Sequence, residues 1–144
     1  MEYDRLASEL FCSFGKITRY ISRQKLEITK GEAFVLQELY KNGPLSPADI
    51  STRVFVSLPR VAAILNSLEK KELVVRLFDP VDRRRVIAVI TDSGRRAAEK
   101  ARKRAFHGLK MVLTQLDDQD AEDFVRIVTT IADKIDSGFF DINT

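Results

Sequence analysis

The sequence has one cysteine, Cys12, and one histidine, His107, which excludes an internal disulfide and leaves too few ligands for a structural zinc site. No apolar run approaches the roughly 20 residues that cross a bilayer, and residues 1–10 lack the pattern of a secretion signal. A glycine-rich phosphate loop, a histidine pair and a nucleophile motif are also missing. We therefore expect a cytoplasmic protein that is not an enzyme and needs no cofactor or metal.

The charge of the chain is distributed unevenly. Residues 1–52 contain seven Lys/Arg and seven Asp/Glu, residues 53–110 contain fifteen and six, and residues 111–144 contain two and eight. The composition, 44% hydrophobic and 31% charged, is ordinary for one folded domain. The cationic middle suits a polyanion such as nucleic acid, and the acidic C-terminal part must point elsewhere.

The first half of the chain carries signals for four helices. Apolar residues recur at spacings of three and four over residues 4–26, which predicts an amphipathic helix. Thr29 and Glu32 form a capping box for a second helix. Ser46 and Ser57 cap a third and a fourth helix, each with proline in its first turn. Two short helices joined by a tight turn are typical of a helix-turn-helix.

The fourth helix has one apolar and one mostly polar face. Its predicted buried stripe is Val61, Ile64, Leu65 and Leu68. Its predicted outward face is Pro59, Arg60, Ala63, Ser67 and Lys70.

A strand pair follows. The β-branched runs 73–78 and 86–91 flank a charged turn that contains Arg83, Arg84 and Arg85. Such a hairpin presents cations to a polyanion. A helix-turn-helix followed by an arginine-tipped hairpin predicts a winged helix-turn-helix.

Two long helices complete the chain. Thr91 is expected to cap a fifth helix that runs through Leu116, and Asp117 starts a sixth that stops at Gly138. The first, fifth and sixth helices carry apolar stripes that residues 29–91 are too few to cover, so we expect a second copy to cover them. A compact monomer is the alternative. The tail adds three apolar residues, Phe139, Phe140 and Ile142.

The hairpin and the helix before it resemble the multiple-antibiotic-resistance-regulator (MarR) family. The resemblance implies a single domain over residues 1–144, mainly α with a small β-wing, in which residues 29–91 form a winged helix-turn-helix and residues 4–28 and 92–144 form dimerisation helices. It also implies a homodimer on pseudo-palindromic double-stranded DNA, commonly a repressor that a small aromatic or phenolic effector or oxidation releases. The matching residues are Leu68-Glu69-Lys70-Lys71, Leu73-Val74, Arg76, Asp79-Pro80, Asp82-Arg83-Arg84, and Thr91 with Gly94.

The resemblance also implies roles for the wing. Asp82 would pair with an arginine and hold the turn, Arg84 would enter the minor groove, and Arg83 would lie beside it at the tip. Glu72 stands where the family usually has glycine. Because a left-handed conformation costs a non-glycine residue about 1 kcal/mol, we expect the fourth helix to end differently.

The predicted DNA interface combines readout with attraction to phosphates. Arg60, where the family usually has a small hydroxyl residue, suits a bidentate contact to guanine, and Ala63 replaces a frequent basic residue. Helix N-termini offer N–H groups to phosphates. A merely solvated charged face, or a winged module that binds another protein, is the alternative. The predicted residues are Ser46, Arg53, Ser57, Pro59, Arg60, Ala63, Lys70, Arg76, Asp82, Arg83, Arg84 and Arg85.

Two further roles stay open. The resemblance implies an effector cleft between the dimer helices and the winged domain, but the sequence offers no distinctive lining for it. Some relatives sense peroxide through a cysteine early in the first helix, whereas the apolar neighbours of Cys12 favour an inert thiol.

Overall fold

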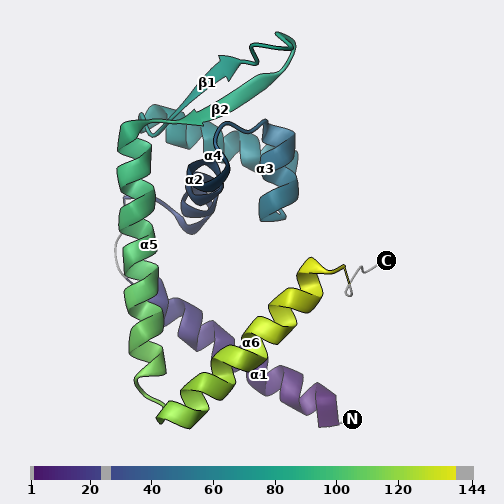
Figure 1. Ribbon diagram of the computed structural model, residues 1–144, viewed down its shortest axis with the longest axis vertical. Helices are drawn as coiled ribbons and strands as arrows, with labels where there is room; N and C mark the ends of the chain where they lie inside the picture. Colours follow the sequence, from purple (N-terminus) through teal and green to yellow (C-terminus); the bar gives the residue numbers. More distant parts are fainter. Residues whose placement is uncertain (1, 24–26, 139–144) are drawn as a thin grey trace. The chain divides into compact units, whose positions relative to one another are not determined.

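The computed structural model describes residues 2–23 and 27–138, and there the chain forms six helices and one β-hairpin (Figure 1). This architecture confirms the predicted mainly α fold with a β-wing. The apolar tail residues Phe139, Phe140 and Ile142 lie outside the described residues. The elements are α1 (Glu2–Ile21), α2 (Lys30–Asn42), α3 (Pro47–Val54), α4 (Leu58–Lys70), β1 (Val74–Phe78), β2 (Val86–Ile90), α5 (Asp92–Leu113) and α6 (Asp118–Asp136).

The elements group into two compact units. The first, the winged unit, covers residues 22–105 and contains α2, α3, α4, the hairpin and the first part of α5. The second, the terminal unit, contains α1, the end of α5 from Phe106 onward, and α6.

Local capping fixes where the helices of the winged unit begin, as predicted. Ser46 Oγ accepts a hydrogen bond from the Asp49 N–H at 3.2 Å, and Thr29 Oγ1 accepts one from the Glu32 N–H at 3.2 Å. Ser57 plays the same part for α4 at a longer 3.4 Å. These bonds satisfy N–H groups that have no partner inside the helix, and each contributes about 1 kcal/mol.

The core of the winged unit lies where α2, α3, α4 and the base of the hairpin meet. Three of the four predicted stripe residues of α4 are fully buried, and Ile64 is partly buried against them. Each fully buried side chain of this size stabilises the fold by about 1.5–3 kcal/mol. The largest buried side chains are Val35, Leu36, Leu39, Ile50, Val61, Leu65, Leu68 and Val74.

The end of α4 corrects one expectation. Glu72 adopts the left-handed conformation, with a φ of 60°, that we expected it to avoid. The Leu73 N–H donates to the Leu68 carbonyl and the Glu72 N–H donates to the Glu69 carbonyl, both at 3.0 Å. This pair of bonds is the Schellman motif, in which glycine is the usual left-handed residue. The helix therefore ends as it would with glycine, at a conformational cost of about 1 kcal/mol.

A tight junction joins the hairpin to α5. Thr91 Oγ1 donates to the Glu72 carbonyl at 2.8 Å and accepts from the Gly94 N–H at 3.0 Å, which confirms Thr91 as the helix cap. A Cβ at position 94 would overlap the Leu73 carbonyl oxygen and lie 2.7 Å from Cγ1 of Ile90. Gly94 is therefore required by the close approach of the backbone and not by its φ.

The first part of α5 is also tied to α2. Gln37 Nε2 donates to the Ala98 carbonyl at 2.7 Å, and the Tyr40 hydroxyl donates to Glu99 at 3.0 Å. Ala98 itself is buried in the core. These contacts make the start of α5 part of the winged unit.

The terminal unit is mostly exposed in the isolated chain. Neither α1 nor α6, both fully described, contains a buried residue. Helix α1 ends at Ile21, before the predicted residue 26, and α5 ends at Leu113, after which residues 114–116 form a turn and not the predicted last helical residues. Gly138, at a φ of 73°, follows α6 as predicted. Within the described residues, no helix combines the length and the apolar character that crossing a membrane requires.

Candidate nucleic-acid interface

The hairpin is an antiparallel pair with Val74 opposite Ile90 and Phe78 opposite Val86. Its base is fixed to the connection between α2 and α3. The Leu45 N–H donates to the Ala88 carbonyl at 3.2 Å, and the Ala88 N–H donates back to the Leu45 carbonyl at 2.8 Å. The wing is therefore anchored at its base and extends beyond α2, α3 and α4 at its far end (Figure 1).

Two aspartates shape the turn at the tip. Asp79 Oδ1 accepts from the Val81 N–H at 2.9 Å, and Asp82 Oδ1 accepts from the Arg84 N–H at 3.1 Å. The Asp79 N–H donates to the Arg85 carbonyl at 2.8 Å and closes the loop. Among the described residues Asp82 therefore holds the turn through the backbone of Arg84, and not through the guanidinium pair that we expected. Such side-chain bonds to nearby N–H groups define Asx turns.

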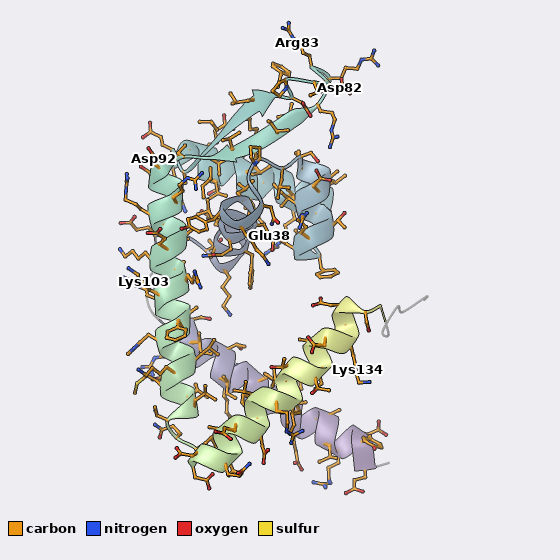
Figure 2. The ribbon with its side chains drawn as sticks, viewed as in Figure 1. Glu38, Asp82, Arg83, Asp92, Lys103 and Lys134 are labelled. Carbon is orange, nitrogen blue, oxygen red and sulfur yellow. The ribbon has the colours of Figure 1, made fainter. Side chains whose placement is uncertain are left out.

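Arg83 and Arg84 lie at the apex of this turn, and both are exposed. Figure 2 shows Asp82 and Arg83 at the far end of the hairpin, away from the helices of the winged unit. No side chain in the described ranges forms an ion pair with either guanidinium. A fixed turn thus presents two unpaired cations on an anchored arm.

Other predicted cations of the wing and the helices form ion pairs within the chain. Arg85 lies 3.6 Å from Asp49, and Arg53 lies 3.9 Å from Glu38, with both arginine side chains about half exposed. Exposed pairs of this kind contribute about 0–1 kcal/mol, so either arginine can exchange its partner for a phosphate at small cost.

Arg76 has a structural role instead. From β1 it reaches across to α4, where its Nη2 donates to the Ala62 carbonyl at 3.3 Å and to Asn66 Oδ1. Its Nε lies 3.2 Å from Glu69 Oε2. Arg76 therefore braces the wing against α4, and its predicted contact with phosphates would require these bonds to break.

The N-terminal part of α4 is open to solvent. Pro59, Arg60, Ala63 and Lys70 are exposed as predicted, and Ser57 is exposed beside them. Ser46 differs, because it is only 5% exposed and its hydroxyl is occupied as the cap of α3. Asp49, in the first turn of α3, also carries a negative charge that repels phosphate. Of the predicted interface, the start of α4 and the tip of the wing are therefore the parts that are exposed.

The comparisons with known proteins agree with this geometry. Residues 26–85, which hold the helix-turn-helix and the wing up to its tip, match the sequence model of the MarR family. The fold is similar to that of a MarR family protein from Bacillus stearothermophilus, with a TM-score of 0.73 and 20% identity over 93% of each chain. The helix-turn-helix and the wing of this chain are thus similar in sequence to the MarR family, and the described fold is a winged helix of the MarR type.

Three individual proteins show the extent of the similarity. The chain is similar to the HTH-type transcriptional repressor MdtR of Bacillus subtilis, with 31% identity over 97 residues, and it spans 63% of that protein's length. Its fold is similar to that of the YusO protein from Bacillus subtilis, with a TM-score of 0.72, 27% identity, and coverage of 90% of this chain and 96% of the other. The Staphylococcus aureus MepR-DNA complex gives a TM-score of 0.71 and 26% identity over 88% and 96% of the two chains.

One buried contact was missed by sequence reasoning. The Glu32 carboxylate does not close the expected capping box toward Thr29. It is 3% exposed and accepts hydrogen bonds from Lys71 Nζ at 2.8 and 3.1 Å, while Ser67 Oγ lies 3.4 Å away. Ser67, predicted on the outward face, is accordingly half-buried. The two partners lie 39 positions apart, so no local signal could have indicated the pair.

The winged unit also contains an open cleft of about 510 Å³ beside Lys71. Its walls include apolar side chains, Glu27 and three cations, of which Lys71 is paired with Glu32, so Arg96 and Lys100 are the cations that could attract an organic anion. The walls come from residues 27–28 and 93–100, which the sequence analysis assigned to the dimerisation helices, and from Lys71 and Leu73 of the winged domain, the junction at which the family resemblance implied an effector cleft. The lining residues are Glu27, Ile28, Lys71, Leu73, Ser93, Arg96, Ala97 and Lys100.

Proposed function

We propose that this chain is a sequence-specific DNA-binding transcriptional regulator, acting in the cytoplasm as a homodimer on pseudo-palindromic operators and not as an enzyme. One observation carries the proposal. The anchored wing displays Arg83 and Arg84 without partners, in the same compact unit as the exposed start of α4. The similarity to the MepR-DNA complex supports this use of the fold.

The roles of the two elements follow from the shape of DNA. Helix α4, which we call the recognition helix, fits the major groove, where Arg60 can contact guanine. Arg84, with Arg83 beside it, enters the minor groove, whose negative potential stabilises a partly desolvated guanidinium. Lys70, Arg53 and Arg85 add attraction that is independent of sequence.

The homodimer follows from the exposed apolar faces of the terminal unit. On α1, Leu6, Leu10 and Phe14 are 43%, 57% and 42% exposed. The five apolar residues of the predicted α6 stripe are similarly open. Large apolar patches on a soluble protein mark an interface, and a two-fold dimer suits a palindromic site. The α6 residues are Phe124, Ile127, Val128, Ile131 and Ile135.

Repression and release by a small aromatic effector remain part of the proposal. MdtR is a repressor by name, and one solved structure with a TM-score of 0.73 concerns regulation of BpsR from Bordetella bronchiseptica by 6-hydroxynicotinic acid. In this chain the cleft beside Lys71 supports binding of an organic anion.

The test is capture of genomic DNA fragments by the full chain, followed by titration of one enriched fragment at several salt concentrations. We expect a palindromic site and a logarithmic salt slope equivalent to several released counterions. Binding without sequence preference, or a protein partner whose binding is insensitive to salt, would contradict the proposal and favour a protein-interaction module.

A further inference from the structure

The exposed face at the start of the recognition helix is mostly apolar, and the charged residues Glu69 and Lys70 lie at the other end of the helix. Over its first two turns the outward residues are Leu58, Pro59, Arg60, Ala62, Ala63 and Asn66. Only Arg60 and Asn66 among them carry polar side chains, and Leu58 is 51% exposed. A face that reads base edges by hydrogen bonds normally carries several polar side chains.

Asn66 is withdrawn from base reading by the wing. Its Oδ1 accepts from Arg76 Nη2, and the same nitrogen donates to the Ala62 carbonyl at 3.3 Å. Glu69 holds Arg76 from the other side at 3.2 Å. Asparagine recognises adenine by using its oxygen and its nitrogen together, as acceptor and donor. With the oxygen facing Arg76, a bidentate contact to adenine would require Asn66 to share or break its bond to the wing.

Arg60 is then the one polar side chain in these two turns that is available for a base contact. The exposed side chains around it are apolar. Pro59 and Ala63 lie four residues apart, on the same side of the helix, and Ala63 lies one turn beyond Arg60. In the major groove the C5-methyl of thymine is the one apolar group that a base edge presents, and alanine is a suitable contact for it.

We propose that the recognition helix reads thymine methyl groups, through Pro59 and Ala63, on either side of a single guanine bound by Arg60. This inference rests on the proposed function, because it specifies the sequence that the same surface prefers. Asn66 acts as a positioning residue that fixes Arg76 and the wing. The operator half-site is therefore expected to be thymine-rich around one guanine and insensitive to adenine at the position facing Asn66.

The experiment selects duplexes from a random pool with the full chain and then alters single atoms in the selected duplex. Replacing one thymine by deoxyuridine removes only the methyl group. At the thymines beside the guanine we expect affinity to fall about three- to fivefold per methyl, the value of one buried methylene-sized group. The same replacement outside the half-sites should change nothing.

Two variants assign the effect to residues. Ala63→Ser places a hydroxyl against the methyl, and the variant should lose most of the difference between thymine and deoxyuridine while remaining folded by circular dichroism. Asn66→Ala is the matched control on the same helix. It should weaken all duplexes alike through the loosened wing and keep the thymine preference.

The outcomes separate the two levels of the argument. A pool that is enriched without thymine in the half-sites, or a duplex that binds equally with deoxyuridine, overturns this inference alone. An adenine preference that disappears in Asn66→Ala also overturns it. A pool with no enrichment overturns the proposed function, and the inference with it.

Discussion

Lys71, at the end of α4, donates two hydrogen bonds to the carboxylate of Glu32, in the first turn of α2. A third bond runs from Lys71 Nζ to the Glu27 carbonyl at 2.9 Å. The carboxylate side chain is 4% exposed and the lysine side chain 37% exposed, so the acid depends on its partner more than the base does. The recognition helix is thereby fixed at its C-terminal end to α2.

The asymmetry of this pair gives the first prediction. Lys71→Ala leaves a buried carboxylate without its cation and should lower the free energy of unfolding by about 2–3 kcal/mol. Adding Glu32→Gln to Lys71→Ala removes the stranded charge and should recover part of that loss. Urea denaturation measures both. A Lys71→Ala protein within about 0.5 kcal/mol of the parent would show that water replaces the lysine.

Substitution by alanine is expected to have opposite effects on stability at Gly94 and at Gly15. A Cβ at Gly94 overlaps the Leu73 carbonyl, so Gly94→Ala should cost about 2–4 kcal/mol or prevent folding. A Cβ at Gly15 in α1 meets only the flexible Arg19 side chain at 3.5 Å, so Gly15→Ala should stabilise by about 0.5–1 kcal/mol. Thermal melting compares them, and equal melting temperatures would rule out the close approach at position 94.

The left-handed backbone at Glu72 predicts that glycine at this position stabilises the fold. At a φ of 60°, Glu72→Gly relieves the left-handed strain and should raise the unfolding free energy by about 0.5–1 kcal/mol. Lys70→Gly, two residues earlier and inside α4, should instead lower it by about 1 kcal/mol. Denaturant titration of both variants provides the measurement. A loss of stability in Glu72→Gly would mean that its side chain matters more than its backbone.

The wing prediction concerns binding without folding. Arg84→Ala should lower affinity for a selected operator about ten- to hundredfold at fixed salt, because it removes an arginine from the minor groove. The melting temperature should not change, since no described residue pairs with this side chain. Arg126→Ala removes the same charge from α6 and serves as the control. Fluorescence anisotropy would contradict the wing assignment if Arg84→Ala bound like the parent.

The dimer prediction uses the apolar face of α6. Ile131, 48% exposed in the single chain, should become buried on association, so Ile131→Glu should give a monomer that binds operator weakly. Thr130→Glu introduces the same charge on the neighbouring polar face and should remain dimeric. Sedimentation at micromolar concentration distinguishes the two, and a monomeric parent protein would overturn the dimer.

Local signals explain which parts of the fold were predictable. A cap acts on N–H groups within three residues, so Thr29, Ser46, Ser57 and Asp117 could be recognised from their neighbours alone. The two strands were placed to within one residue at each end, because their β-branched runs are also a local signal. The ends of α1 and α5 were both placed too late in the chain, because an apolar pattern continues beyond the last helical residue.

Contacts between distant residues were not predictable. Arg76 looks like any other cation in a basic segment, and only the packing of β1 on α4 brings it to Asn66. Glu32 fits a capping box by sequence, yet Lys71 offers it a charged partner in a buried place. In the wing, Asp79 gave no sign that it holds the turn alongside Asp82. Each of these depends on tertiary geometry.

The mutual hydrogen bonds between Leu45 and Ala88 divide the hairpin into a fixed root and a free arm. Residues added or deleted beyond that root would alter how far the arginines reach around the duplex and leave the helices undisturbed. The span of the wing and the base preference of α4 can therefore diverge independently during evolution.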